Sequence, residues 1–162
     1  MRVRLAAAVL LFAVAAGAGW AQTPTESARE LIARYHEDPR RIDRARDLLE
    51  AHLQRERPVE AMILLSHVYF LVGEIRAASD EDRLVAYGRG RDWGQRAVEL
   101  APRSEDAHVW YGSNLARWGQ MKGVLRSLFL LPTVREEIET ILSLNPRSVR
   151  GRALAGNVLF EV

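Results

Sequence analysis

The chain has 162 residues, 48% of them hydrophobic, which is enough to bury one core without disulfide or metal cross-links. It has no cysteine, which excludes a disulfide framework and a bacterial lipid anchor and counts against structural zinc. Its 23 basic residues exceed the 21 acidic ones by two, and Arg2 and Arg4 account for this excess. Residues 22–162 are therefore formally neutral, and we expect no nucleic-acid partner because no surplus cations remain to neutralise phosphates.

The first 21 residues have the pattern of a secretory signal peptide. A charged start precedes an apolar run over 5–17, which is shorter than the roughly 20 residues needed to cross a bilayer. Gly19-Trp20-Ala21 puts small residues at the two positions that a signal peptidase reads. We predict a signal peptide over 1–21 and a soluble exported product, periplasmic in a Gram-negative bacterium. An uncleaved anchor is the alternative.

Residues 22–162 predict one all-helical domain of about seven helices. Apolar residues recur at three- and four-residue spacing, and no stretch alternates with period two over enough residues for a strand. Caps and stops bound the helices: Thr25 and Ser79 as N-caps, Asp38-Pro39 as a start, Gly119 as an end and Pro132 as a bend or restart. The expected helices lie at about 26–36, 39–54, 59–73, 80–100, 107–118, 121–144 and 148–162.

Three prolines, Pro58, Pro102 and Pro146, stand 44 residues apart and indicate a repeat. A small residue follows each proline within a helix: Ser66, Gly112 and Gly156. A period near 40 residues is typical of a helical solenoid, in which each unit buries its apolar face against its neighbours. We predict repeat units over about 58–101 and 102–145 and an incomplete one over 146–162. Gly112 and Gly156 are predicted to be packing positions where helices approach closely.

The repeats resemble those of the tetratricopeptide superfamily. Leu65-Ser66-x-x-Tyr69 is similar to the first helix of such a repeat, and Ala97-x-x-Leu100-x-Pro102 to the close of the second. The resemblance implies an antiparallel helix-pair solenoid, although the second helices here are about ten residues longer than a 34-residue repeat requires. Gly90 falls where the superfamily usually has alanine, which with Gly88 and Gly94 indicates tight packing.

One branch of the superfamily is especially similar. The stretches 93–102 and 107–112 look like the regulator-of-microtubule-dynamics family and its bacterial relatives. They are also similar to the T component of tripartite ATP-independent periplasmic transporters, which implies a substrate-binding subunit as a candidate partner. The chain departs from those T components, which are lipoproteins, because it lacks the cysteine. It also ends at Val162, one helix into a repeat. Residues 148–162 are therefore either a terminal capping helix or part of a unit in a longer repeat protein, and we expect a fragment because a cap should present a polar outer face and this segment is largely apolar.

The sequence predicts a binding protein, not an enzyme. Its four histidines show no HExxH pair, and it has neither a phosphate-binding loop nor a GxSxG elbow. Acidic residues gather at Asp80-Glu81-Asp82 and Glu136-Glu137, but N-terminal halves of helices attract carboxylates through the helix dipole alone. We therefore predict no catalytic residue, no metal site and no cofactor.

The first helix of each pair lines the concave face of such a solenoid. Its exposed side lies one residue past the small position and four residues before or after that point. Large aromatic side chains such as Trp110 are expected in the core. The function predicted is an exported scaffold that docks another exported protein or a peptide segment on this face. Its centre is predicted to consist of His67, Phe70, Ser113, Arg117 and Asn157.

An apolar run over 124–131 supports an alternative function. It carries more apolar residues than one buried stripe needs, among them Leu125, Leu128 and Phe129. These could line a pocket for a small apolar ligand in a transport accessory protein, or fill the space beneath a bend at Pro132. A protected cavity beside Phe129 would favour the ligand, and an open groove would favour the scaffold.

We predict that the signal peptide is cleaved after Ala21. The intact mass of the protein recovered from the exported fraction measures this directly, and it should correspond to a chain beginning at Gln22. A recovered mass that still includes residues 1–21 contradicts the prediction.

Overall fold

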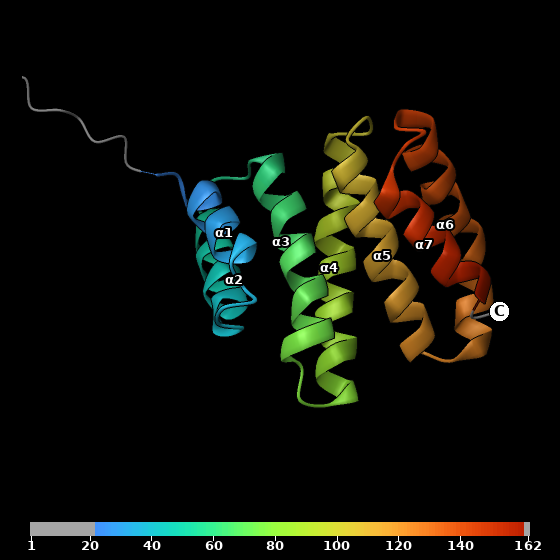
Figure 1. Cartoon of the computed structure of the whole chain (residues 1–162), viewed down its shortest axis with the longest axis horizontal. Coiled ribbons are helices and arrows are strands. Elements are labelled where there is room, and N and C mark those ends of the chain that lie inside the picture. The colour runs from blue at the N-terminus through green and yellow to red at the C-terminus, as the bar shows by residue number, and fades with distance from the viewer. Residues whose placement is uncertain (1–21, 161–162) are drawn as a thin grey trace, which may run out of the picture.

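A computed structural model describes residues 22–160, and these form the all-helical solenoid that the sequence predicts (Figure 1). A π-helical turn, Val72–Arg76, extends the third helix. The predicted leader over 1–21 lies outside the described residues, and no helix within them is long and apolar enough to span a bilayer. The helices are α1 (Pro24–Ala33), α2 (Arg40–Leu53), α3 (Val59–Leu71), α4 (Asp80–Leu100), α5 (Glu105–Met121), α6 (Val124–Leu144) and α7 (Val149–Phe160).

Each helix packs against the next one in the chain, and the odd-numbered helices also pack against one another. Contacts join α1 to α3, α3 to α5 and α5 to α7, in addition to every consecutive pair. Figure 1 shows the resulting row of helices from α1 at one end to α6 and α7 at the other. The odd-numbered helices therefore form one continuous layer, which is the arrangement that a helix-pair solenoid requires.

The start of α1 differs from the prediction, because Thr23 and not Thr25 is the cap. The Thr23 hydroxyl accepts a hydrogen bond from the Glu26 amide at 3.2 Å, and the Glu26 carboxylate accepts one from the Thr23 amide at 2.9 Å. Pro24 occupies the first helical position, where its missing N–H costs nothing. Thr25 consequently lies inside the first turn and is buried. The predicted cap at Ser79 is confirmed, since its hydroxyl accepts from the Asp82 amide at 3.1 Å.

Helix α5 passes Gly119 and ends at Met121, and the chain turns at Gly123 with φ 96°. That positive φ is open to glycine and strained for other residues. Helix α6 then continues through Pro132 without a restart. Pro132 has no backbone N–H, so it leaves the Leu128 carbonyl without its helical donor.

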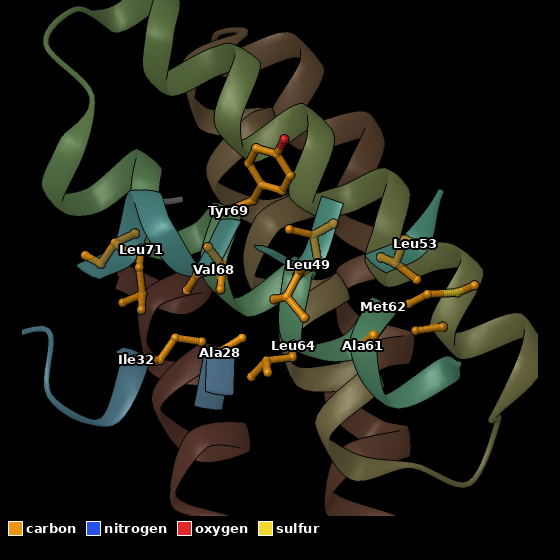
Figure 2. Close-up of a cluster of buried hydrophobic side chains, with 14 of the residues drawn as sticks. Ala28, Ile32, Leu49, Leu53, Ala61, Met62, Leu64, Val68, Tyr69 and Leu71 are labelled. Atoms are coloured by element: carbon orange, nitrogen blue, oxygen red, sulfur yellow. The ribbon is translucent and has the colours of Figure 1, made fainter. Parts of the chain in front are cut away.

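The main core joins α1 to α5, and a smaller one joins α5 to α7. Ala28, Leu49 and Val68, each fully buried, come from three successive helices of the main core (Figure 2). Val109, Ile141 and Leu154 make up the smaller core. Helix α5 contributes Ala107 to the main core and Val109 to the smaller one, so this helix joins the two halves of the solenoid.

A buried polar cluster links α3, α4 and α5. The Ser66 hydroxyl donates to the Gly90 carbonyl at 2.8 Å, and the Asn114 amide donates to the Ser66 carbonyl at 3.0 Å. A Cβ atom on Gly90 would lie only 2.3 Å from Asn114 Oδ1, and one on Gly94 would lie 2.7 Å from Tyr111 Cα. The tight packing predicted from the three glycines of α4 is therefore confirmed at Gly90 and Gly94 but not at Gly88, where a Cβ atom would make only ordinary contact with Trp118.

The two repeat glycines have different surroundings. A Cβ atom on Gly112 would lie 3.0 Å from Leu154 Cδ2 and 3.3 Å from Glu137 Cβ, so its predicted role in packing is confirmed. A Cβ atom on Gly156 would meet nothing within 4 Å, so that half of the prediction is wrong for the described residues. Gly112 is met by α6 and α7, whereas no described element follows α7 to meet Gly156.

Two glycines on α4 make a matched pair for testing this packing. Gly90→Ala should lower the free energy of unfolding by roughly 1–3 kcal/mol, because the new methyl group collides with the hydrogen-bonded Asn114 amide. Gly88→Ala should be neutral or stabilise by up to about 1 kcal/mol, because the nearest atoms of Trp118 lie at an ordinary 3.4 Å and alanine favours a helix interior. Urea unfolding measures both. Equal midpoints for the two variants would show that Asn114 can move aside without cost.

Candidate binding groove

A groove runs along the odd-numbered helices and contains two adjoining pockets. The wide pocket has a volume of about 390 Å³ and is lined by α1, α3, α5 and α7. The narrow pocket has a volume of about 160 Å³ and is lined by α3, α5 and α7. Trp110 and Arg150 line both pockets and form the boundary between them.

The five residues predicted for the concave face all line this groove. Phe70, Ser113, Arg117 and Asn157 line the narrow pocket, and His67 lines the wide pocket. They come from three successive odd-numbered helices, as the repeat geometry predicted. What the groove binds remains a prediction.

An aromatic floor crosses the groove between α3 and α5. The rings of His67 and Trp110 are stacked, with centroids 3.7 Å apart and planes within 10°. The Phe70 ring lies 5.7 Å from the Trp110 ring and 6.1 Å from the Tyr87 ring. Trp110, expected in the core, is partly buried: it packs against the smaller core and also lines both pockets. His67 and Phe70 are three residues apart on one face of α3, so both of their rings contact the Trp110 ring.

Arg150 is a groove residue that the sequence interpretation missed. Its guanidinium pairs with the Asp106 carboxylate, lies 3.8 Å from the Glu105 carboxylate and stands 5.9 Å from the Trp110 ring centroid. Arg150 follows Asp106 by 44 residues, which is the repeat period. The period alone therefore put these opposite charges at equivalent positions on adjacent first helices, and this signal could have identified the pair.

Arg117 is held at the other end of the narrow pocket. Its guanidinium lies 3.0 Å from the Glu74 carboxylate, and it also donates to the Gln120 side chain at 3.2 Å. Glu74 accepts a second hydrogen bond, at 2.9 Å, from the Tyr87 hydroxyl. Burial and this hydrogen bond raise the pKa of Tyr87, so the hydroxyl stays a donor. Glu74 belongs to the π-helical turn, which places its carboxylate beside the Arg117 guanidinium.

The run over 124–131 does not form the enclosed pocket considered for an apolar ligand. Leu125 is 75% exposed, Leu128 is 47% exposed and Phe129 is 77% exposed. Side chains this open to solvent do not enclose a ligand. The other interpretation, that they fill space beneath a bend at Pro132, is wrong for the same reason.

A buried acid–base pair lies outside the groove. His108 Nδ1 on α5 is 2.6 Å from Glu137 Oε2 on α6, and His108 Nε2 is 3.0 Å from the Pro102 carbonyl. Burial raises the pKa of Glu137, and the hydrogen bond with His108 opposes that rise. Both ring nitrogens are engaged, so the pair joins α5 to α6 and leaves no free ring nitrogen. Among the described residues, no three His, Asp or Glu side chains gather closely enough to hold a metal ion.

The similarity of this chain to known proteins agrees with the helical architecture. A family model for regulator of microtubule dynamics proteins 1-3 matches residues 25–162. The chain belongs to this family. Regulator of microtubule dynamics protein 1 of Mus musculus is 25% identical to it over 85 residues, which is 52% of this chain. The match spans only 28% of the mouse protein's length. Family membership supports a helical protein that acts by interaction or regulation.

The His67–Trp110 stack generates a prediction about pH. Burial lowers the pKa of His67 from its ordinary value of 6.5 to about 4, and the Arg150 charge adds to the effect. The folded protein therefore binds fewer protons than the unfolded chain between these values, and stability should fall as the pH falls from 6.5 towards 4. His67→Phe keeps a stacking ring without a titrating group. The variant should lose less stability than the wild type over this window, by at most about 3 kcal/mol.

Urea unfolding at neutral pH and near pH 4.5 measures the difference. All other titrating groups are shared by the two proteins, so their contributions cancel to first order. Parallel pH profiles of the two proteins would mean that the pKa of His67 is the same in the folded protein as in the unfolded chain.

Proposed function

We propose that this protein is a non-catalytic scaffold that docks a protein or peptide segment in the groove along α3, α5 and α7. The observation that carries the proposal is the convergence of five side chains, from three successive odd-numbered helices, on one aromatic-floored groove. Family membership supports a role in interaction. In this proposal the groove has the concave geometry of a tetratricopeptide-like repeat.

The narrow pocket is smaller than a site for a drug-sized ligand, whereas the wide pocket, at about 390 Å³, falls within the size range of such sites. Sites for drug-sized ligands occupy about 300–1,000 Å³. The narrow pocket, at about 160 Å³, is suited to a single side chain. Its floor includes Phe70, Val109 and Leu154, and its rim includes Ser113 and Asn157, whose polar groups can bond a peptide backbone. An apolar anchor seated in such a pocket typically carries much of the binding energy of an interface.

We further propose that the scaffold works in the exported compartment, which is the periplasm in a Gram-negative bacterium. The signal-peptide pattern of residues 1–21 and the resemblance to exported transporter components support this location. The partner would then be an exported protein, and a transporter substrate-binding subunit is one candidate. In this proposal nucleic acid is not a partner.

Photo-cross-linking can identify the partner. A photoreactive amino acid at Asn157, which is exposed at the groove rim, should capture the docked protein in the exported compartment. The matched control is Gln95, which is exposed on α4 and lines neither groove pocket. Mass spectrometry then reads the captured protein. Equal capture from both positions would argue against the groove as the docking site.

Two substitutions test the groove against the partner so identified. Phe70→Ala and Arg117→Ala should each weaken binding by about 1 kcal/mol or more, because interfaces concentrate their energy in aromatic and arginine anchors. Phe129 lies outside the groove pockets, so Phe129→Ser should leave the affinity for this partner unchanged. Titration calorimetry measures the three affinities, and circular dichroism checks that each variant keeps its helical signal and thermal midpoint. Full affinity in both groove variants would rule the groove out.

A further inference from the structure

The first half of α6 carries an exposed apolar stripe. Val124 is 77% exposed, Leu125 75%, Leu128 47% and Phe129 77%. We call these four residues the α6 patch. They fall at positions i, i+1, i+4 and i+5, which lie on one face of the helix. No residue from 124 to 133 is buried, so this half of α6 keeps a face that the described residues leave open.

The α6 patch lies in a stretch of the chain that lacks acidic residues and therefore carries a net positive charge. Residues 107–135 contain no aspartate or glutamate, but they contain the four cations Arg117, Lys122, Arg126 and Arg135. Three cations also surround the Trp118 ring, with Arg91 at 4.3 Å, Arg126 at 5.4 Å and Lys122 at 5.6 Å from its centroid. Trp118 belongs to α5, so Lys122 and Arg126 lie on the α5 side of the patch, whereas Arg91 is on α4 and is already paired with Asp92 at 2.7 Å.

The charges decide between occupants. A second copy pairing through the same patch would bring the cations at 122 and 126 of both copies together. Residues 107–135 offer no carboxylate to offset that repulsion. A stripe of four residues over two turns is one helix wide, which suits a helix better than a bilayer plane. The complementary surface is an apolar helical face bordered by acidic residues.

We propose that the α6 patch docks an amphipathic helix of another protein, with apolar side chains on the patch and Asp or Glu beside Lys122 and Arg126. This is a second interface, separate from the groove, since none of the four patch residues lines either groove pocket. Burying the patch removes its exposed apolar surface from water, and the acidic border selects the partner and its orientation.

A synthetic probe helix about 18 residues long tests the proposal. One probe has leucines on one face and glutamates along both borders, and its control has lysines in place of the glutamates. Fluorescence anisotropy with the full chain should show tighter binding of the glutamate probe, and this advantage should shrink as salt is added. Phe129→Ser and Leu125→Ser should each weaken binding of the glutamate probe roughly fivefold or more. Lys122→Gln with Arg126→Gln should remove the preference for glutamate.

Two controls keep the interfaces apart. Val149 is 74% exposed on α7, so Val149→Ser removes a comparably open apolar side chain outside the patch and should leave probe affinity unchanged. Phe70→Ala, which disables the groove, should also leave it unchanged, so failure of one interface does not imply failure of the other. Circular dichroism verifies folding of every variant.

Three outcomes overturn the proposal. The first is a probe result that does not depend on charge or on the patch: equal affinity for the two probes, or an affinity for the glutamate probe that Phe129→Ser leaves unchanged. The second is Phe129-dependent flotation of the chain with phosphatidylcholine–phosphatidylglycerol vesicles in the absence of probe binding, which would identify a lipid surface as the occupant. The third is a dimer in light scattering that Phe129→Ser dissociates, which would identify a second copy.

Discussion

The close approach of α3, α4 and α5 around the Asn114 side chain is the contact on which the rest of the structure depends. The Asn114 amide donates to the Ser66 carbonyl on α3 at 3.0 Å and to the Trp110 carbonyl one turn earlier on α5 at 2.8 Å. Only glycine at position 90 leaves room for this amide. Asn114 Oδ1 is buried and makes no hydrogen bond to another described residue.

The same contact determines the geometry of the groove. Because Asn114 ties α5 to α3, Trp110 is held at the distance where its ring stacks on His67. Arg150 on α7 and Asp106 on α5 then extend the floor to the next helix. The groove is therefore a consequence of core packing rather than a separate feature, and its walls are rigid elements, which suits a surface that recognises a partner without large rearrangement.

The groove and the α6 patch are physically different surfaces. The groove has a partly buried aromatic floor whose charges are paired across helices, as in Arg117 with Glu74. The α6 patch is open, and the cations beside it gather on the Trp118 ring. Binding in the groove should depend on shape and on a few anchor residues. Binding on the α6 patch should depend on the burial of apolar surface, with charge selecting the partner. A solenoid can hold both, because each face of its helix layers is independent of the other.

The sequence by itself determined the helical class, the approximate helix bounds and the face that lines the groove. The 44-residue period and the helical repeat of apolar residues are local, additive signals, so Phe70, Ser113, Arg117 and Asn157 could be assigned to one side of successive helices. Only the tertiary structure decided how deeply each side chain is buried. Trp110 and Phe129 are both large aromatic residues on helices, yet one forms the groove floor and the other faces solvent. Gly112 and Gly156 share an offset from proline, yet within the described part of the chain only Gly112 is closely packed. These differences depend on how closely the opposite helix packs at each position, and the offset from a proline, which is the same for Gly112 and Gly156, carries no information about that distance.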